Sequence, residues 1–340
     1  MSNPKQFCIE PEADATWTFG RHIAINDKYL VISDSLRNKV TVYTPDGSGE
    51  WQKAKDILPP ANLDLGPKFI SAFGTGLELD GDFLAISART KNSERLKRGL
   101  SQAQKNKVPR YLYWRYLTNL GTQAPLKSID LLVEPEPNSD RVRFNLLRRG
   151  KIEQFILPNM DKKTFGDNGH GLGTRVALDG NLLLVGYLSD DGTGGAYLFD
   201  LARPEAEPLN LAVENAALGN KVAVSQQFAA VGFDGYRWQF SSGVRSRSHM
   251  TLICNLSNGA TSIVNSFGKV SLSGNILAVM HPYHYEAPTV FLEAYRLDEN
   301  AQAHLITKQT VYLGEVQNGF LFTQKDDKSK RVCIEPLPKN

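Results

Sequence analysis

The sequence has few cysteines and no long apolar segment. Its three cysteines, Cys8, Cys254 and Cys333, stand at unrelated spacings, which favours neither a disulfide framework nor a CxxC metal site. This pattern predicts a reducing, cytoplasmic setting. No run of about 18 apolar residues is present, so no transmembrane helix is expected. The first residues also lack the basic and apolar regions of a secretory signal.

Several motifs of common enzyme classes are missing as well. The chain contains no GxSxG elbow, no HExxH pair and no Walker loop, which weakens an enzymatic interpretation without excluding it. The formal net charge of +3 is too small to indicate nucleic-acid binding by itself. The 340 residues are 41% hydrophobic and 22% charged, which is typical of a globular protein with two domains or one large all-β domain.

What the sequence does contain is an internal repeat. Six segments begin with Phe-Gly or Leu-Gly and continue into alternating and then continuous apolar residues. The gap between the second and third glycines spans 99 residues, about twice the other spacings of 46 to 54 residues. The segment LGTQAPLKSIDLLVE, which starts at Leu120 near the middle of this gap, is interpreted as a degenerate seventh copy. The six clear glycines are Gly20, Gly74, Gly173, Gly219, Gly268 and Gly314.

Each copy predicts three or four β-strands. A short alternating strand is followed by a tight turn, such as Asp80-Gly81 or Asp179-Gly180, whose residues suit two-residue hairpins. A continuous apolar run such as Leu182–Val185 then indicates a strand buried on both faces. Repeats of this kind predict the blades of a β-propeller, here with seven blades in a single domain over residues 1–340.

The two ends of the chain carry nearly identical segments. QFCIEP at 6–11 resembles RVCIEP at 331–336, and the last copy has room for only three strands. Because propellers often complete the last blade with the N-terminal strand, we expect residues 6–11 to close it. Cys8 and Cys333 would then lie on neighbouring strands, where we interpret them as small buried hydrophobic residues.

The blade pattern FGxxVAxDGNxLLVGxxxDDGxGGAxxxF resembles the FG-GAP repeat of integrin α-subunit propellers and their bacterial relatives. The match is best at 172–199 and recognisable at 19–43, 73–88 and 267–295. The resemblance implies a seven-bladed β-propeller but no particular activity. Calcium-binding members insert an oxygen-rich loop between the first two strands, whereas the turns here are too short to surround a cation. Asp190 and Asp191 are therefore interpreted as a solvated turn or an occasional cation contact, and no metal or other cofactor is expected.

A column of charged residues appears when the copies are aligned. Since equivalent positions on innermost strands line the channel of a propeller, these side chains are expected to gather at one mouth and to favour an anion. Alternatively, they are hydrated groups that only keep the channel polar. The charged residues of the column are His22, Arg175, Lys221, Lys269 and Glu315, with Gly76 at the same position in the second copy.

Loops on the same face carry further candidate binding residues. The segment 281–286 offers His281, Tyr283 and His284, and the segment 234–240 offers Tyr236, Arg237 and Trp238. Aromatic residues beside Arg and His are typical of recognition surfaces, although packing against a blade edge would explain them equally well.

An insertion at 89–110 is strongly basic, with eight Lys or Arg residues against the single acidic residue Glu94. It suits an acidic partner, and less well an anionic membrane surface or nucleic acid; a solvated loop is the alternative. Its basic residues are Arg89, Lys91, Arg95, Lys97, Arg98, Lys105, Lys107 and Arg110.

Two functional hypotheses follow from these features. The first is a non-catalytic interaction protein that recognises an acidic protein, peptide or anionic ligand through its top face and basic loop. The second is an enzyme acting on an anionic small molecule at the channel mouth. In the second case His22 or His284 would act as acid or base, and Tyr283 would be an auxiliary donor. Arg175 and Lys221 would hold the anion. The sequence leaves the oligomeric state open.

Overall fold

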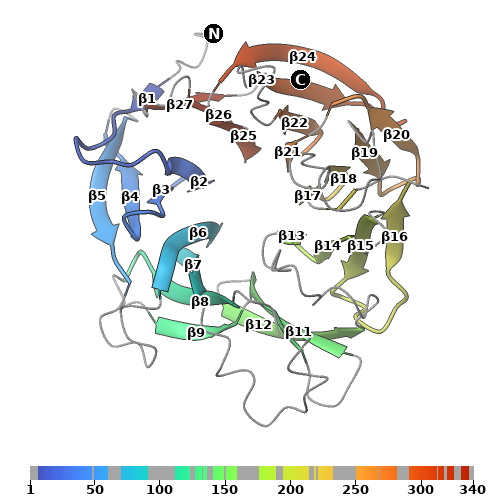
Figure 1. The fold of residues 1–340 in the computed structure, drawn as a ribbon, viewed down its shortest axis with the longest axis horizontal. Coiled ribbons are helices and arrows are strands. Elements are labelled where there is room, and N and C mark those ends of the chain that lie inside the picture. Colours follow the sequence, from blue (N-terminus) through green and yellow to red (C-terminus); the bar gives the residue numbers. More distant parts are fainter. Residues whose placement is uncertain are drawn as a thin grey trace, which may run out of the picture. The chain divides into compact units, whose positions relative to one another are not determined.

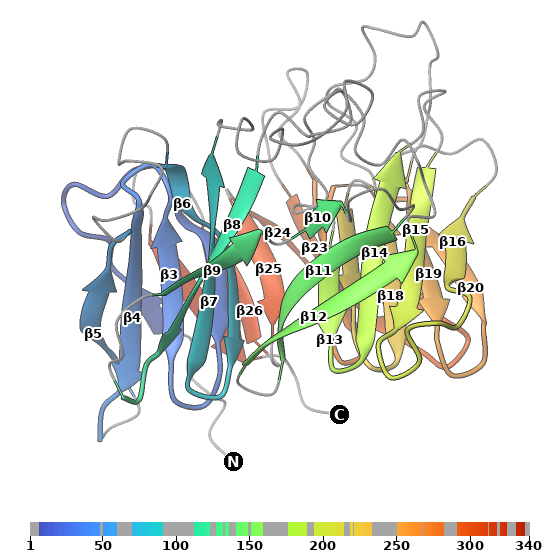
Figure 2. The same cartoon turned by 90° about the horizontal axis from the view of Figure 1, so that it is seen from below.

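The computed structural model shows an all-β chain. Every regular element in its described residues is a β-strand (Figures 1 and 2). Within this part of the chain, no helix has the length and apolar character needed to cross a membrane. The structure describes residues 7–47, 50–59, 70–90, 112–122, 127–131, 133–135, 141–148, 151–158, 176–188, 194–213, 218–219, 221–232, 250–266, 268–281, 291–311, 313–317, 320–324 and 331–336.

The chain divides into two compact units. The N-terminal unit comprises Ile9–Gly173, and the C-terminal unit comprises Met1–Cys8 with Thr174–Asn340. Each unit consists of antiparallel sheets in which sequential strands are neighbours, apart from β1, which joins the last sheet.

The N-terminal unit contains two four-stranded sheets and one three-stranded sheet among its described residues. The first sheet has β2 (Phe19–Ile25), β3 (Leu30–Asp34), β4 (Lys39–Pro45) and β5 (Trp51–Ile57). The second has β6 (Ile70–Asp80), β7 (Phe83–Thr90), β8 (Leu112–Asn119) and β9 (Lys127–Leu131). The three-stranded sheet has β10 (Val133–Pro135), β11 (Arg141–Arg148) and β12 (Lys151–Pro158).

The C-terminal unit contains four four-stranded sheets among its described residues. The first has β13 (Val176–Asp179), β14 (Leu182–Leu188), β15 (Gly194–Asp200) and β16 (Leu209–Ala212). The second has β17 (Lys221–Val224), β18 (Phe228–Gly232), β19 (Thr251–Asn255) and β20 (Thr261–Val264). The third has β21 (Lys269–Ser273), β22 (Ile276–Met280), β23 (Phe291–Leu297) and β24 (Ala303–Thr310). The last has β25 (Leu313–Gln317), β26 (Phe320–Gln324), β27 (Val332–Pro336) and β1 (Phe7–Ile9).

Four-stranded antiparallel sheets that pack on one another in chain order are the blades of a β-propeller, as the repeat predicts. The first strands of successive blades pack together, as β17 does with β13 and β21 (Figure 1). The prediction of seven blades is wrong: the described residues form six four-stranded blades, and β10–β12 form a three-stranded sheet.

The segment at Leu120 is not the start of a blade. It lies in the turn between β8 and β9, where the Leu120 amide donates to the Asp82 carbonyl at 2.7 Å. The Asn119 side chain accepts a hydrogen bond from the Thr122 amide in the same turn. Leu120-Gly121 therefore lies in the turn that joins the outer strands of the second blade. The prediction of a seventh copy at Leu120, which relied on even spacing, is wrong.

The apolar runs and the hairpin turns occur where the sequence predicts them. All five residues of β3 and of β18 are buried, as expected for strands covered on both faces. Three of the hairpin glycines, Gly81, Gly180 and Gly274, have φ angles of 56°, 59° and 57°. This left-handed conformation suits glycine and explains why the turns carry Asp-Gly or Ser-Gly pairs.

Within each unit, neighbouring blades enclose apolar cores. In the N-terminal unit, Val31 and Val40 of the first blade pack with Phe73, Leu84 and Tyr116 of the second. Burying a large apolar side chain stabilises the folded state by about 1.5–3 kcal/mol, so this apolar packing is the main interaction between neighbouring blades. In the C-terminal unit, comparable clusters are centred on Leu184 and Val231, on Phe228 and Val279, and on Leu292 and Leu321.

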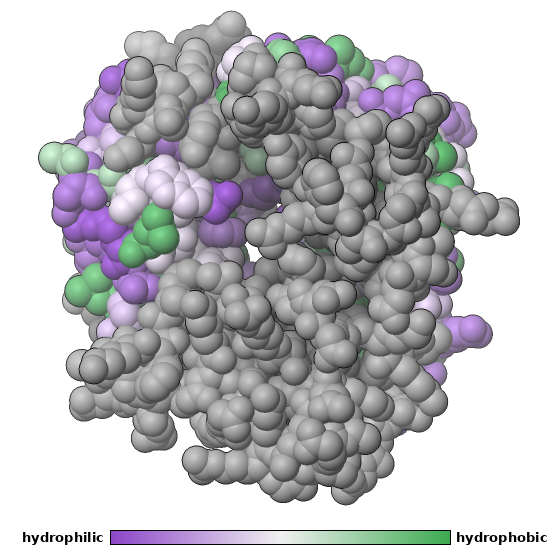
Figure 3. Space-filling view, in the orientation of Figure 1, coloured by the Kyte–Doolittle hydropathy of each residue, from purple (hydrophilic) through white to green (hydrophobic). Residues whose placement is uncertain are grey.

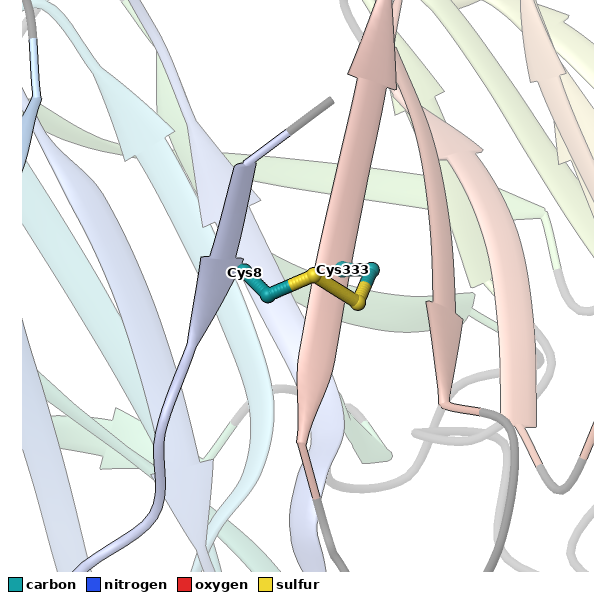
Figure 4. The surroundings of a disulfide bond; sticks show 2 residues. All are labelled: Cys8 and Cys333. Atoms are coloured by element: carbon teal, nitrogen blue, oxygen red, sulfur yellow. A yellow bond between two sulfur atoms is a disulfide. The ribbon is translucent and has the colours of Figure 1, made fainter. Parts of the chain in front are cut away.

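The N-terminal strand completes the last blade, as the matching ends of the chain predict. Strand β1 is the neighbour of β27, and Cys8 forms a disulfide with Cys333 across the pair, with the Cα atoms 4.0 Å apart (Figure 4). The interpretation of these cysteines as unbonded hydrophobic residues is therefore wrong, and the remaining Cys254 is buried and free. The lack of a disulfide was the reason for expecting a reducing, cytoplasmic setting, and that reason no longer holds.

Candidate functional site

The strand pairing tests the alignment that produced the charged column. Lys221 pairs with Gly232 on β18, and Lys269 pairs with Met280 on β22. Each lysine lies four residues before the residue that opens its hairpin, Ser225 or Ser273. The two lysines therefore occupy equivalent positions on β17 and β21, which pack against each other within the C-terminal unit.

Because side chains alternate between the two faces of a sheet, equivalent positions on β17 and β21 place both lysines on the same face of their own blades. Lys221 and Lys269 are the first residues of β17 and β21, and both are half-buried. The strand register thus places two cationic residues at equivalent positions, and cationic groups that lie close together raise the local positive potential and favour an anion.

Of two other members of the column, His22 keeps the same distance from its hairpin and Glu315 does not. His22 of the N-terminal unit is half-buried and also lies four residues before its hairpin, which opens at Asn26. Glu315 lies only two residues before Gln317, the last residue of β25 that pairs across its hairpin. Glu315 is thus two residue pairs closer to its turn than Lys269 is to its own.

Many predicted site residues lie outside the described residues. Arg89 belongs to β7, of which only the backbone is described at this position. The predicted site residues that lie wholly outside the described residues are Arg175, Asp190, Asp191, Tyr236, Arg237, Trp238, Tyr283, His284, Lys91, Arg95, Lys97, Arg98, Lys105, Lys107 and Arg110.

His281, predicted from its loop composition, belongs to a polar cluster that the sequence did not suggest. Its Nε2 atom lies 2.8 Å from Ser266 Oγ and 2.9 Å from Glu293 Oε2. The same carboxylate oxygen accepts hydrogen bonds from Ser266 Oγ at 2.9 Å and from Tyr295 OH at 2.7 Å. Lys308 Nζ donates to the other oxygen, Oε1, at 2.7 Å.

The cluster has the residue types of a hydrolytic triad but not its geometry. Ser266 and Glu293 contact the same histidine nitrogen, whereas a triad needs the serine on one nitrogen and the carboxylate on the other. Ser266 is fully buried, which also keeps a substrate carbonyl away from its hydroxyl. The arrangement therefore suits a structural role better than nucleophilic catalysis.

The electrostatics of the cluster depend on Glu293. Burial raises the pKa of this carboxyl group, but hydrogen bonds from Lys308, His281, Tyr295 and Ser266 outweigh it and lower the pKa to about 2. Burial and the neighbouring carboxylate raise the pKa of Tyr295. Glu293 is thus ionised at neutral pH and holds its four donors together.

We expect Glu293→Gln to destabilise the protein at neutral pH by about 2 kcal/mol, because hydrogen bonds to a charged acceptor are lost. A lowered native pKa contributes stability that is present above the unfolded value, near 4.5, and is lost as the pH falls towards 2. The difference between wild type and Glu293→Gln should therefore shrink between pH 4.5 and 2. Urea unfolding at several pH values measures it, and a difference that stays constant with pH would contradict this assignment.

Sequence reasoning missed most of this cluster because its members are far apart in the chain. Glu293 pairs directly with Lys308 across β23 and β24, and Ser266 approaches from the preceding blade. One signal was available: Glu293 interrupts the apolar run of β23, where an unpartnered carboxylate would be costly.

The chain matches no protein-family model and no curated protein sequence. Among solved structures, it is similar to a streptogramin B lyase, with 10% identity, a TM-score of 0.49 and coverage of 97% of this chain and 96% of that chain. It is also similar to a hypothetical selenium-binding protein from Sulfolobus tokodaii, with 10% identity, a TM-score of 0.47 and coverage of 87% and 81%. An acylaminoacyl peptidase from Pyrococcus horikoshii has 12% identity, a TM-score of 0.38 and coverage of 75% and 42%. The β-propeller assignment rests on the order and packing of the sheets themselves.

Proposed function

We propose that this protein is a non-catalytic binding propeller that recognises an acidic protein, peptide or anionic ligand. The observation that carries the proposal is the equivalent position of Lys221 and Lys269. Each lies four residues before the hairpin on the first strand of its blade, and these two strands, β17 and β21, pack together. Arg175, at the same position of the preceding copy, would add to the positive potential of the two lysines. The basic segment 89–110 belongs to the N-terminal unit and would be a separate contact for an acidic partner. A blade scaffold fits this role because propellers present loops and strand ends without needing a catalytic group.

The geometry around Ser266 argues against hydrolysis at this group of residues. In the described residues, the Ser266, His281 and Glu293 group is stabilised by its own hydrogen bonds rather than open to a substrate. An enzyme of the alternative kind would depend on His22, Arg175, Tyr283 and His284, of which Arg175, Tyr283 and His284 lie outside the described residues.

We also propose that the chain is a divergent member of the FG-GAP class without the calcium loops. Its support is the conformation of the glycines that open the repeat copies. Gly20, Gly74, Gly219 and Gly268 have φ angles of 80°, 89°, 93° and 136°, in the region where glycine is favoured. A shared backbone requirement of this kind would preserve the Phe-Gly or Leu-Gly motif.

The test of the binding function uses labelled poly-glutamate as a probe for an acidic partner. We expect Lys221→Glu/Lys269→Glu to weaken its binding at least about tenfold, since two favourable charges become repulsive. Deleting residues 90–107 should also lower the affinity and reduce its dependence on salt. Fluorescence anisotropy at several salt concentrations measures both effects.

A charge-matched control is Lys28→Glu/Arg203→Glu, which alters two exposed cations outside the column by the same total charge. Equal losses in this control and in Lys221→Glu/Lys269→Glu would show a nonspecific charge effect and contradict the site. Unchanged poly-glutamate binding after both the substitutions and the deletion would contradict the proposed function.

A further inference from the structure

An exposed aromatic and aliphatic surface lies on the first blade of the N-terminal unit. Trp17 precedes β2 and is 45% exposed, while Leu36 follows β3 and is 54% exposed. The Arg21 guanidinium lies 4.7 Å from the centre of the Trp17 ring. Figure 3 shows hydrophobic surface among hydrophilic residues over β2–β5. We call Trp17, Arg21 and Leu36 the tryptophan surface.

A buried carboxylate holds the backbone under the tryptophan surface. Asp34, 1% exposed, accepts hydrogen bonds from the Thr16 amide at 2.8 Å, from the Thr16 hydroxyl and from the Thr18 hydroxyl at 2.7 Å. Thr18 Oγ1 in turn accepts a hydrogen bond from the Leu36 amide at 3.0 Å. These bonds fix the segments that carry Trp17 and Leu36 beside each other. Hydrogen bonds therefore already fix the backbone that carries the exposed side chains. Binding a ligand would cost little conformational entropy of this backbone.

The charges around this surface favour an acidic ligand. The exposed carboxylates nearby are already paired, Glu12 with Lys39 and Lys53, and Asp14 with Arg37, while the Asp34 carboxylate is buried and hydrogen-bonded to Thr16 and Thr18. Hydrogen bonds from Lys39 and Lys53 lower the pKa of Glu12 to about 2, so this pairing persists at neutral pH. Arg21, in contrast, forms no ion pair with any carboxylate in the described residues. Its stacked position on Trp17 leaves the edge of the guanidinium available for a bidentate contact with a carboxylate.

We propose that the tryptophan surface binds a peptide segment of a partner protein in which a large apolar side chain stands next to an acidic residue. The apolar side chain packs against Trp17 and Leu36, and the carboxylate pairs with Arg21. Trp and Arg are the residue types that most often dominate binding energy at interfaces, and an ordered base is where such anchors are effective. The site lies in the N-terminal unit, on residues different from Lys221 and Lys269, and does not depend on the anion site proposed there.

The experiment is a selection of phage-displayed random peptides of about 12 residues on the intact protein, run in parallel on Trp17→Ala. Peptides enriched by wild type but not by Trp17→Ala should carry Asp or Glu within two positions of Leu, Ile, Phe or Trp. The most enriched peptide, synthesised with a fluorophore, should bind Trp17→Ala and Arg21→Gln at least about tenfold more weakly than wild type, which corresponds to about 1.4 kcal/mol. Thermal unfolding checks that both variants keep the wild-type fold.

Matched control variants test whether peptide binding depends on the tryptophan surface alone. Leu305→Ala removes a side chain that is 57% exposed on β24 and should leave the peptide affinity unchanged. Lys221→Glu/Lys269→Glu should also leave it unchanged, so failure of the anion site and failure of the tryptophan surface are distinguishable. The proposal is overturned if no enrichment depends on Trp17, if the enriched peptides are neutral or basic, or if only Lys221→Glu/Lys269→Glu weakens binding.

Discussion

Reduction of the Cys8–Cys333 disulfide should lower the free energy of unfolding by about 4 kcal/mol. The bond joins residues 325 positions apart, so breaking it releases nearly the whole chain in the unfolded state. In the chain-entropy description, long loops of this kind give the largest stabilisation. Cys8 is exposed on β1, which lets a reductant reach the bond in the folded protein. Thermal unfolding with and without reductant should show a fall in the melting temperature of about 5–10 °C.

The number of titratable thiols provides the first control. Of the three cysteines, only Cys254 is free, so the denatured, non-reduced protein should release one thiol rather than three. Cys8→Ser should melt at the lower temperature whether or not reductant is present. A protein whose thiols are all reduced but whose melting temperature is unchanged would show that the bond does not stabilise the last blade.

Gly219→Ala should destabilise the protein by about 3–5 kcal/mol, and some of the variant should fail to fold. Gly219 opens the blade β17–β20 with a φ of 93°, a conformation that strains an L-residue. An added Cβ atom would also overlap the backbone carbonyl oxygens of Gly195 and Tyr187 on the preceding blade. Backbone atoms cannot move aside as a flexible side chain can, so the two blades would have to separate. Urea unfolding gives the free energy of the variant.

Gly259→Ala is the matched control for this prediction. Gly259 has a similar φ of 74°, but an added Cβ atom would meet nothing within 4 Å. Its substitution tests the backbone strain alone and should cost about 1 kcal/mol. Equal effects of Gly219→Ala and Gly259→Ala would contradict the close approach of the two blades at Gly219.

The close approach at Gly219 gives a physical reason for part of the repeat. Gly74 stands in the same position of its copy, and a Cβ atom there would lie 2.9 Å from the Ser33 Cβ atom on the preceding blade. At Gly74 and Gly219, the backbone that leads into a blade thus packs closely against the preceding blade, and a side chain there would disturb this packing.

The sequence alone determined the elements whose causes are local. Alternating and continuous apolar runs predicted the strands, and pairs such as Asp179-Gly180 predicted the hairpins, because strand periodicity and turn conformation depend on adjacent residues. The matching ends of the chain predicted the pairing of β1 with β27. Even spacing was less reliable, since Leu120 matched a repeat position but lies in a turn between outer strands.

Only the tertiary structure decided which distant side chains meet. Cys8 and Cys333 form a disulfide because strand pairing brings their Cα atoms to 4.0 Å, a distance that no cysteine spacing predicts. Glu293 gathers donors from two blades, and Asp34 orders the base under Trp17 from 16 to 18 residues away. Such contacts depend on strand register and on how one blade packs on the next. Register and packing follow from many weak interactions summed over the fold, and therefore leave little trace in any short segment of the sequence.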